Sequence, residues 1–336
     1  MTTATGIGSW PGQDVREPLR IVRELLGGLD PDSDGVTGLP YLPELPGRGP
    51  GGDLIGRTAG LLVDLPVDLQ PAGWRLVDRP GRDLQRTAAF WREDLDVLAE
   101  TFDGYAGQLK LAVAGPWTLA AGLWLPRGER AVVDPSAARD LTESLAEGLR
   151  GLLTTVAGHL PGAELVVQID EPSLPTVLAG RLPTASGYGR LPAVDPQVVL
   201  PTIQTVLEAA GERHTLVHCC DRQPPQTLLR RAGAGGLAFD TALLTPAGWE
   251  GLAVAAEEGR RVYLGCVPTT GALPSVADLA ADVAQAWARL GMPSAGLADL
   301  AVTPSCGLAG ATAAEAIERQ RRCVEVARAL ADRAVS

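Results

Sequence analysis

Short apolar runs alternate with amphipathic stretches from one end of this sequence to the other. Apolar runs of this length, bounded by polar or turn-forming residues, are typical of buried strands. The stretches between them carry helix signals, such as Asp134 and Pro135 at the start of a helix expected over 135–159. Strands that alternate with helices predict a parallel sheet with helices packed on it.

The expected strands are Thr5–Ser9, Val36–Leu42, Lys110–Ala114, Glu164–Ile169, His214–Cys219, Gly236–Phe239, Arg261–Gly265 and Leu300–Thr303. Eight strand–helix units predict an α/β fold of the (β/α)8 TIM barrel type, and residues 1–336 suit a single domain of this kind. An open doubly wound sheet is the alternative. Its dinucleotide fingerprint is missing, because the glycine-rich turn at 6–11 lacks the third glycine. Long βα loops are expected at 38–52 and 183–196, on the side where a barrel keeps its active site.

Composition excludes several functional classes. The net charge is −11 and no basic cluster stands out, so neither nucleic acid nor an anionic membrane surface is an expected partner. No apolar run approaches the length of a membrane span, and the first residues lack a signal region, which predicts a cytoplasmic protein. Five cysteines in a reducing compartment indicate metal ligands or buried thiols rather than disulfides.

Polar side chains end several of the expected strands. In a barrel the carboxyl ends of the strands meet at one mouth, so these side chains are expected to converge there. This convergence is the strongest internal argument for an enzyme. The residues concerned are Ser9, Asp170, His218, Cys220, Asp240 and Cys306.

The stretch His218-Cys219-Cys220 indicates a metal site. Side chains two apart on a strand share a face, so His218 and Cys220 lie side by side while Cys219 points away. Nitrogen and sulfur ligands together suit zinc. Two further candidates end their own strands, namely Asp240 and Cys306. The alternative is that the cysteines are small buried apolar residues.

Two other strand ends carry candidate substrate ligands. Asp170 and Glu171 follow a buried strand, and an acid at this point can hold a substrate ammonium group or act as a base, although a turn before Pro172 also explains them. The turn over residues 6–9 has glycines that allow close backbone approach, and free N–H groups there suit a carboxylate. A plain tight turn remains the alternative. Glu44 lies in a proline-bounded loop above the mouth, where a surface role is the default.

Several motifs together resemble one family. In order along the chain they are Gly6-Ile7-Gly8-Ser9, Gly115-Pro116-Trp117-Thr118-Leu119, Gln168-Ile169-Asp170-Glu171-Pro172, His218-Cys219-Cys220 and Pro304-Ser305-Cys306-Gly307-Leu308. The set resembles the C-terminal catalytic half of cobalamin-independent methionine synthase, over nearly the whole chain. The folate-dependent enzymes of that family carry a second barrel in front, so this sequence is similar to the single-barrel form.

The resemblance implies roles for individual residues. It implies that Zn²⁺ is held by the pair His218 and Cys220 together with Asp240 and Cys306, with Asp240 standing where the family has Glu. The substrate residues that it implies are Ile7 and Ser9 for homocysteine, Asp170 for its amino group in the catalytic site, and Glu44 by a looser match.

Three departures from the family concern the methyl donor. Gly122 stands at the position of a tryptophan that stacks on folate, and Thr176 at that of a glutamate that contacts the pterin. Cys266 stands where the family has its catalytic proton-donating histidine. A tetrahydrofolate leaving group needs a proton, whereas a corrinoid leaves without one. The departures therefore predict methylcobalamin or a corrinoid protein as donor rather than folate.

The function expected from the sequence is a zinc-dependent methyltransferase that converts homocysteine to methionine. Three alternatives stay open. The first is another zinc thiol alkyltransferase or lyase of the same superfamily. The second is a decarboxylase of that superfamily, which needs no zinc ligands. The third is a barrel whose metal site is structural or lost.

Overall fold

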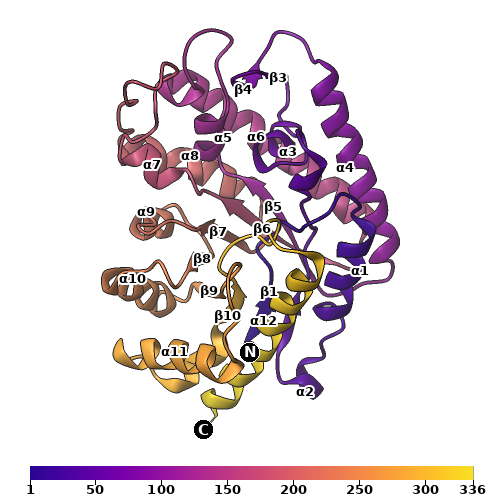
Figure 1. The fold of residues 1–336 in the computed structure, drawn as a ribbon, viewed down its shortest axis with the longest axis vertical. Coiled ribbons are helices and arrows are strands. Elements are labelled where there is room, and N and C mark those ends of the chain that lie inside the picture. The colour runs from indigo at the N-terminus through magenta and orange to yellow at the C-terminus, as the bar shows by residue number, and fades with distance from the viewer. Residues whose placement is uncertain (336) are drawn as a thin grey trace.

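An eight-stranded parallel sheet forms the centre of the computed structural model, which describes residues 1–335 (Figure 1). The order of the strands in the sheet is β2-β1-β10-β9-β8-β7-β6-β5. The nearly closed sheet with helices around it confirms the predicted (β/α)8 TIM barrel. Its strands are β1 (Thr3–Thr5), β2 (Thr37–Leu39), β5 (Gln108–Ala114), β6 (Glu164–Asp170), β7 (Thr215–Cys219), β8 (Gly236–Asp240), β9 (Arg261–Val267) and β10 (Ala301–Pro304).

The barrel closes between β2 and β5 through an isolated bridge. Tyr41, just beyond β2, pairs in parallel with Lys110 of β5. The N–H of Lys110 donates to the carbonyl of Pro40 at 2.8 Å, and the N–H of Leu42 donates to the carbonyl of Lys110 at 3.0 Å. We call this contact the closing seam. It is shorter than the ladder between β5 and β6 or the ladder between β7 and β8.

Helices surround the sheet on its outer side (Figure 1). Helices α7 to α11 line one flank of the barrel in this view, and α1, α4 and α12 lie along the other. The bounds are α1 (Arg16–Leu25), α2 (Pro31–Asp34), α3 (Leu54–Ala59), α4 (Arg82–Thr101), α5 (Pro116–Gly122), α6 (Pro135–His159), α7 (Leu174–Leu178), α8 (Pro196–Glu208), α9 (Gln226–Arg231), α10 (Pro246–Glu257), α11 (Val276–Arg289) and α12 (Ala313–Ala334), with short 3₁₀ helices at Pro46–Arg48, Ala131–Val133 and Ser294–Asp299.

The strands separate two apolar clusters. A small cluster fills the barrel interior, and a large one lies between the sheet and the helices. Leu216 belongs to the first, whereas Val217 and Cys219 belong to the second. Since side chains alternate along a strand, His218 and Cys220 point inward with Leu216. The interior cluster consists of Leu39, Val166, Leu216, Ala238, Tyr263 and Ala301.

Two features differ from the sequence prediction. Strand β1 ends at Thr5, because Gly6–Ser9 leaves the sheet to form a turn, whereas the expected strand began at Thr5. An antiparallel hairpin of β3 (Val67–Gln70) and β4 (Gly73–Leu76) was not predicted at all. In the described residues, no helix has both the length and the apolar character that a membrane crossing requires.

Candidate metal centre and substrate site

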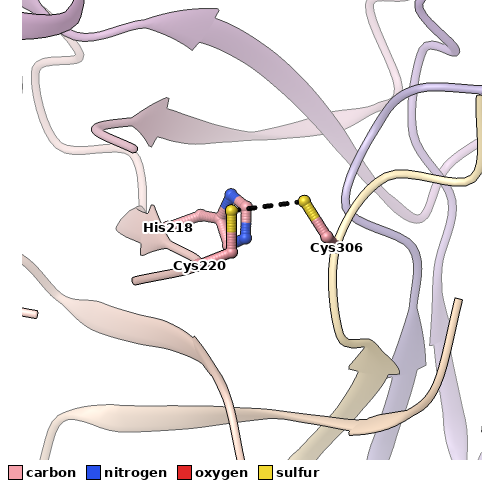
Figure 2. A group of neighbouring side chains, drawn as sticks. All are labelled: His218, Cys220 and Cys306. Atoms are coloured by element: carbon pink, nitrogen blue, oxygen red, sulfur yellow. Dashed lines mark hydrogen bonds between the residues drawn. The ribbon is translucent and has the colours of Figure 1, made fainter. Parts of the chain in front are cut away.

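Three side chains meet at the mouth of the barrel. His218 is the last residue but one of β7, Cys220 follows this strand, and Cys306 lies two residues after β10 (Figure 2). Their ligand atoms all lie within 4.8 Å of one another. His218 is buried, and Nε2 of its ring is a buried atom without a hydrogen-bond partner. A nitrogen and two sulfurs at this spacing fit the ligand set that zinc prefers, and the unpartnered Nε2 is the atom such an ion would take.

Asp170 holds the other nitrogen of the histidine ring. Nδ1 of His218 lies 2.8 Å from Oδ1 of Asp170, and β6 and β7 place the two residues opposite each other. A carboxylate only accepts, so Nδ1 carries the proton and Nε2 is the free acceptor. Burial opposes the charge on the imidazole, but the hydrogen bond and the charge of Asp170 outweigh burial and raise the pKa of His218. Carboxylates commonly orient metal-binding histidines in this way.

The two cysteine thiols form a hydrogen bond with each other. Their Sγ atoms lie 3.3 Å apart (Figure 2). The hydrogen bond from Cys220 is the main cause that lowers the pKa of Cys306 to about 6. The same bond, together with burial, raises the pKa of Cys220. Cys306 is therefore the thiol that ionises more readily, and a metal ion bound here would favour ionisation of Cys220 as well.

The glycine-rich turn and Glu44 lie together across the mouth. The N–H of Trp10 donates to the carbonyl of Glu44 at 2.8 Å, and the N–H of Glu44 donates to the carbonyl of Gly8 at 3.1 Å. These bonds leave the N–H groups of Gly8 and Ser9 without a partner in the described chain. The turn also touches the loop of Cys306, because a Cβ on Gly307 would lie 1.9 Å from Oγ of Ser9. The structure thus gathers the first, second and last strand ends.

Glu44 and Asp170 are the acids of this mouth. Glu44 is buried, its Oε1 has no partner, and burial raises its pKa to about 7, with the charge of Asp170 adding to the effect. Oδ1 of Asp170 accepts from both His218 and Gln168. The second oxygen of Asp170 is therefore available to a ligand. Two acids beside free backbone N–H groups suit an amino acid, with its ammonium on the acids and its carboxylate on the turn.

Sequence reasoning missed Lys110 and Gln168, which connect these parts. Lys110 is 1% exposed inside the barrel, and its Nζ donates to the carbonyl of Gly6 and, at 2.5 Å, to Oε1 of Gln168. Nε2 of Gln168 donates to the carbonyl of Ile7 and to Asp170, both at 2.8 Å. Burial lowers the pKa of Lys110 to about 7. An inward-facing polar residue on a buried strand is the signal that would have identified both.

Glu171, predicted as a possible site acid, has a structural role. It accepts hydrogen bonds from the N–H groups of Trp117 and Thr118 and from the hydroxyl of Thr118, at 2.8 to 3.0 Å. Burial raises its pKa to about 7. The carboxyl group therefore supports the first turn of α5 and the loop after β5, and of these two adjacent acids only Asp170 faces the mouth.

Comparison with known families agrees with this geometry. The model for the catalytic domain of cobalamin-independent synthase matches residues 1–329. The chain belongs to this family. Among solved structures, a B12-independent methionine synthase from Shewanella sp. W3-18-1, in complex with selenomethionine, is similar with a TM-score of 0.61 and 12% identity, covering 96% of each chain. No curated protein matches. The resemblance seen in the motifs is confirmed, and the chain is an enzyme, a methyltransferase of the 5-methyltetrahydropteroyltriglutamate–homocysteine type.

The resemblance also assigns roles to Asp240 and Cys266, which lie outside the group formed by His218, Cys220 and Cys306. Asp240 ends β8 on the inward face, but its Oδ1 accepts from the N–H of Ala242, and burial raises its pKa. Its role as fourth ligand stays a prediction. Cys266 follows the inward-facing Gly265 on β9, so it points outward, where it packs in the cluster that contains Cys323 of α12. The structure does not bring Cys266 to the mouth, and burial raises its pKa to about 12.

The structure also shows where Gly122 and Thr176 lie, the two positions at which the sequence departs from the family's folate contacts. A Cβ on Gly122, at the end of α5, would lie 2.7 Å from Cδ1 of Ile55 on α3. Ile55 therefore fills the space that a larger side chain at 122 would need. Thr176 lies on α7, next to the βα loop that follows β7, and both line one hollow.

Proposed function

We propose that this protein methylates the thiol of homocysteine to give methionine, at a zinc ion held by His218, Cys220 and Cys306, with Asp240 as a fourth ligand. The observation that carries the proposal is the buried, unpartnered Nε2 of His218 facing two cysteine sulfurs within 4.8 Å. The family match supports the reaction class, and the solved relative's complex with selenomethionine supports an amino-acid ligand of this kind.

The chain's own residues position the amino acid. Oδ2 of Asp170 and the carboxylate of Glu44 accept from the ammonium group, and the N–H groups of Gly8 and Ser9 donate to the carboxylate. Ile7 is held by Gln168 through its carbonyl, which fixes the turn. The thiol end of the substrate then faces the two cysteines. When bound, zinc supplies the positive charge that keeps a thiol ionised near neutral pH, since a free thiol has a pKa of roughly 8.5.

The donor that fits the family better is a folate, and we adopt it in the proposal. The corrinoid donor expected from the sequence finds no support in the comparisons, because the family is described as independent of cobalamin. Cys266 points away from the mouth, so it is not the acid that a folate leaving group needs. We further propose that residues 1–336 act as one catalytic domain.

Turnover by the zinc-loaded protein tests the proposal. Homocysteine is offered with methyltetrahydropteroyltriglutamate or, separately, with methylcobalamin, and methionine is measured by mass spectrometry. Methionine formation that depends on zinc and is lost in Cys306→Ser is the expected result. The proposal would be overturned in favour of a structural metal site by one combined result. The protein would bind zinc tightly, form no methionine with either donor and show no binding of homocysteine in calorimetry.

A further inference from the structure

A group of buried charges lies beside the mouth and has no part in the site described so far. Asp94 of α4 is 1% exposed and accepts hydrogen bonds from two arginines, from Arg48 at 2.6 Å and from Arg57. Arg48 also meets the exposed Glu93 at 3.5 Å. In the described chain Arg57 pairs with no other acid. One buried acid therefore serves two cations, and the charge that remains uncompensated is that of Arg57.

Arg57 is held in one orientation at the mouth. It lies on α3, where the next residue, Thr58, accepts from the N–H of Ala114 at the end of β5 at 2.8 Å. Its guanidinium carbon lies 3.7 Å from the centroid of the Trp91 ring, and the indole N–H of Trp91 donates to the carbonyl of Arg57 at 2.9 Å. Because Nη1 is bound to Asp94, the direction of the remaining N–H groups is fixed.

The edge of Arg57 formed by Nε and Nη2 has no partner. Arg57 is 2% exposed, and both nitrogens are buried without a hydrogen bond in the described residues. With a fork of N–H groups of this kind, arginine binds carboxylates through two parallel hydrogen bonds. A buried donor left unpaired costs about 1–3 kcal/mol, and more when it is charged. An anion close to this edge is therefore favoured.

Glu44 supplies a buried carboxylate with the matching property. Its Oε1 is also buried without a partner, whereas Oε2 lies toward the glycine-rich turn, since a Cβ on Gly8 would lie 3.9 Å from it. Four charged groups act on Glu44. Asp170 of β6 and Asp94 of α4 raise its pKa, while Arg57 of α3 and Lys110 of β5 lower it. Arg57 has the larger effect of the two cations, so it contributes most to ionisation of Glu44.

We propose that Arg57 is a positioning residue of the substrate site, which compensates the charge of Glu44 from the buried side and leaves Oε2 of Glu44 ionised for the ammonium group of the amino acid. Arg57 does not touch the substrate and acts through Glu44. The inference rests on the proposed function, because it takes the ammonium group of homocysteine to lie at Glu44 and Asp170. It makes recognition of the amino group depend on a charge that lies outside the mouth.

Calorimetry with two thiols tests the assignment on the zinc-loaded protein. Homocysteine is compared with 4-mercaptobutanoate, which has the same thiol and carboxylate but lacks the amino group. The ratio of the two Kd values therefore reports the ammonium contact. The wild type should prefer homocysteine, and the preference should grow as pH rises through about 7, where Glu44 ionises.

Arg57→Gln should reduce this preference at pH 7 by about tenfold, and its midpoint should move up by about one pH unit or more, because a neighbouring opposite charge lowers a carboxyl pKa by about 1–3. Arg48→Gln is the matched control, since it removes the other arginine from Asp94, and its midpoint should stay near that of the wild type. Arg57→Lys keeps the positive charge and should keep the preference. It also covers the case in which Arg57→Gln does not fold.

Zinc content and thermal unfolding of the same samples show which variants are folded. A folded Arg57→Gln variant with the wild-type preference and midpoint overturns the inference. So does an equal change in Arg48→Gln, or a loss of the preference in Arg57→Lys. If the wild type still forms methionine in these cases, the proposed function stands without this role for Arg57. A wild type that does not prefer homocysteine over 4-mercaptobutanoate overturns both the inference and the ammonium contact on which it rests.

Discussion

Asp170 accepts a hydrogen bond from Nδ1 of His218 at 2.8 Å, and this one contact joins the predicted substrate residue to the predicted metal ligand. It fixes the tautomer in which Nε2 faces the two cysteines. Because Oδ1 of Asp170 is occupied, the same carboxylate offers only Oδ2 to a substrate ammonium group. In the proposed site, metal binding and substrate binding would therefore be linked through a single side chain.

The metal ligands can be tested by zinc content. We expect about one zinc per chain in the wild type and a large loss in Cys306→Ser, because a hydroxyl is a poor replacement for a thiolate. Cys266→Ser is the control, since Cys266 packs away from the mouth. Elemental analysis after dialysis measures both. Full zinc retention by Cys306→Ser would remove this residue from the site.

Asp170→Asn should affect both partners of the carboxylate. Loss of the charge that faces the ammonium group should weaken homocysteine binding by about 3–5 kcal/mol. The weakened support of His218 should lower zinc affinity by about 10–100-fold. Calorimetry and competition with a zinc chelator measure the two effects. The control is Asp282→Asn, an exposed acid on α11, and identical behaviour of the two variants would contradict the assignment.

Glu44→Gln should change the pH dependence of stability. The pKa of Glu44 is raised to about 7 from 4.5, so the folded state binds an extra proton between these values and loses stability as pH rises through them. The variant should lack this loss, which is worth about 3 kcal/mol at most. Urea unfolding at several pH values between 4.5 and 8 measures it, with the exposed Glu257→Gln as control. Parallel curves for Glu44→Gln and the wild type would show that Glu44 titrates normally.

Lys110→Met should destabilise the barrel and weaken homocysteine binding together. The variant leaves the carbonyl of Gly6 and Oε1 of Gln168 unpaired, and each buried acceptor costs about 1–3 kcal/mol. Gln168 also holds Ile7, so the turn that receives the carboxylate loses support. The matched control is Leu111→Met, the next residue on β5, which faces the helices. Chemical denaturation and calorimetry that show no difference between the two variants would refute the role of Lys110.

The strand-end residues could be predicted because alternation and parallel pairing are simple rules. His218, Cys220 and Cys306 meet as expected once the eight strands form a barrel. The helix at 135–159 also has the predicted bounds, since Asp134 caps its first turn by accepting from the N–H groups of Ser136 and Ala137. In these cases the decisive interactions are local or follow from strand order alone.

Other features of the site depend on the register of the strands and on which face of each strand points into the barrel. The sequence alone determines neither. The bond between Asp170 and His218 requires that β6 and β7 pair at these residues. The inward direction of Lys110 and the outward direction of Cys266 follow from alternation only when the interior face of each strand is known. The hairpin β3–β4 was missed because neither of its short strands contains a run of apolar residues.

The closing seam contains a residue whose chemical reactivity can be measured. Lys110, whose backbone makes both bonds of the seam, is the sole lysine of the sequence. Lys110 is 1% exposed, so in the intact barrel the amino terminus is the amine that an acylating reagent can reach. Acylation of Lys110 therefore requires the barrel to open around this side chain, and the rate of acylation would measure how often it opens.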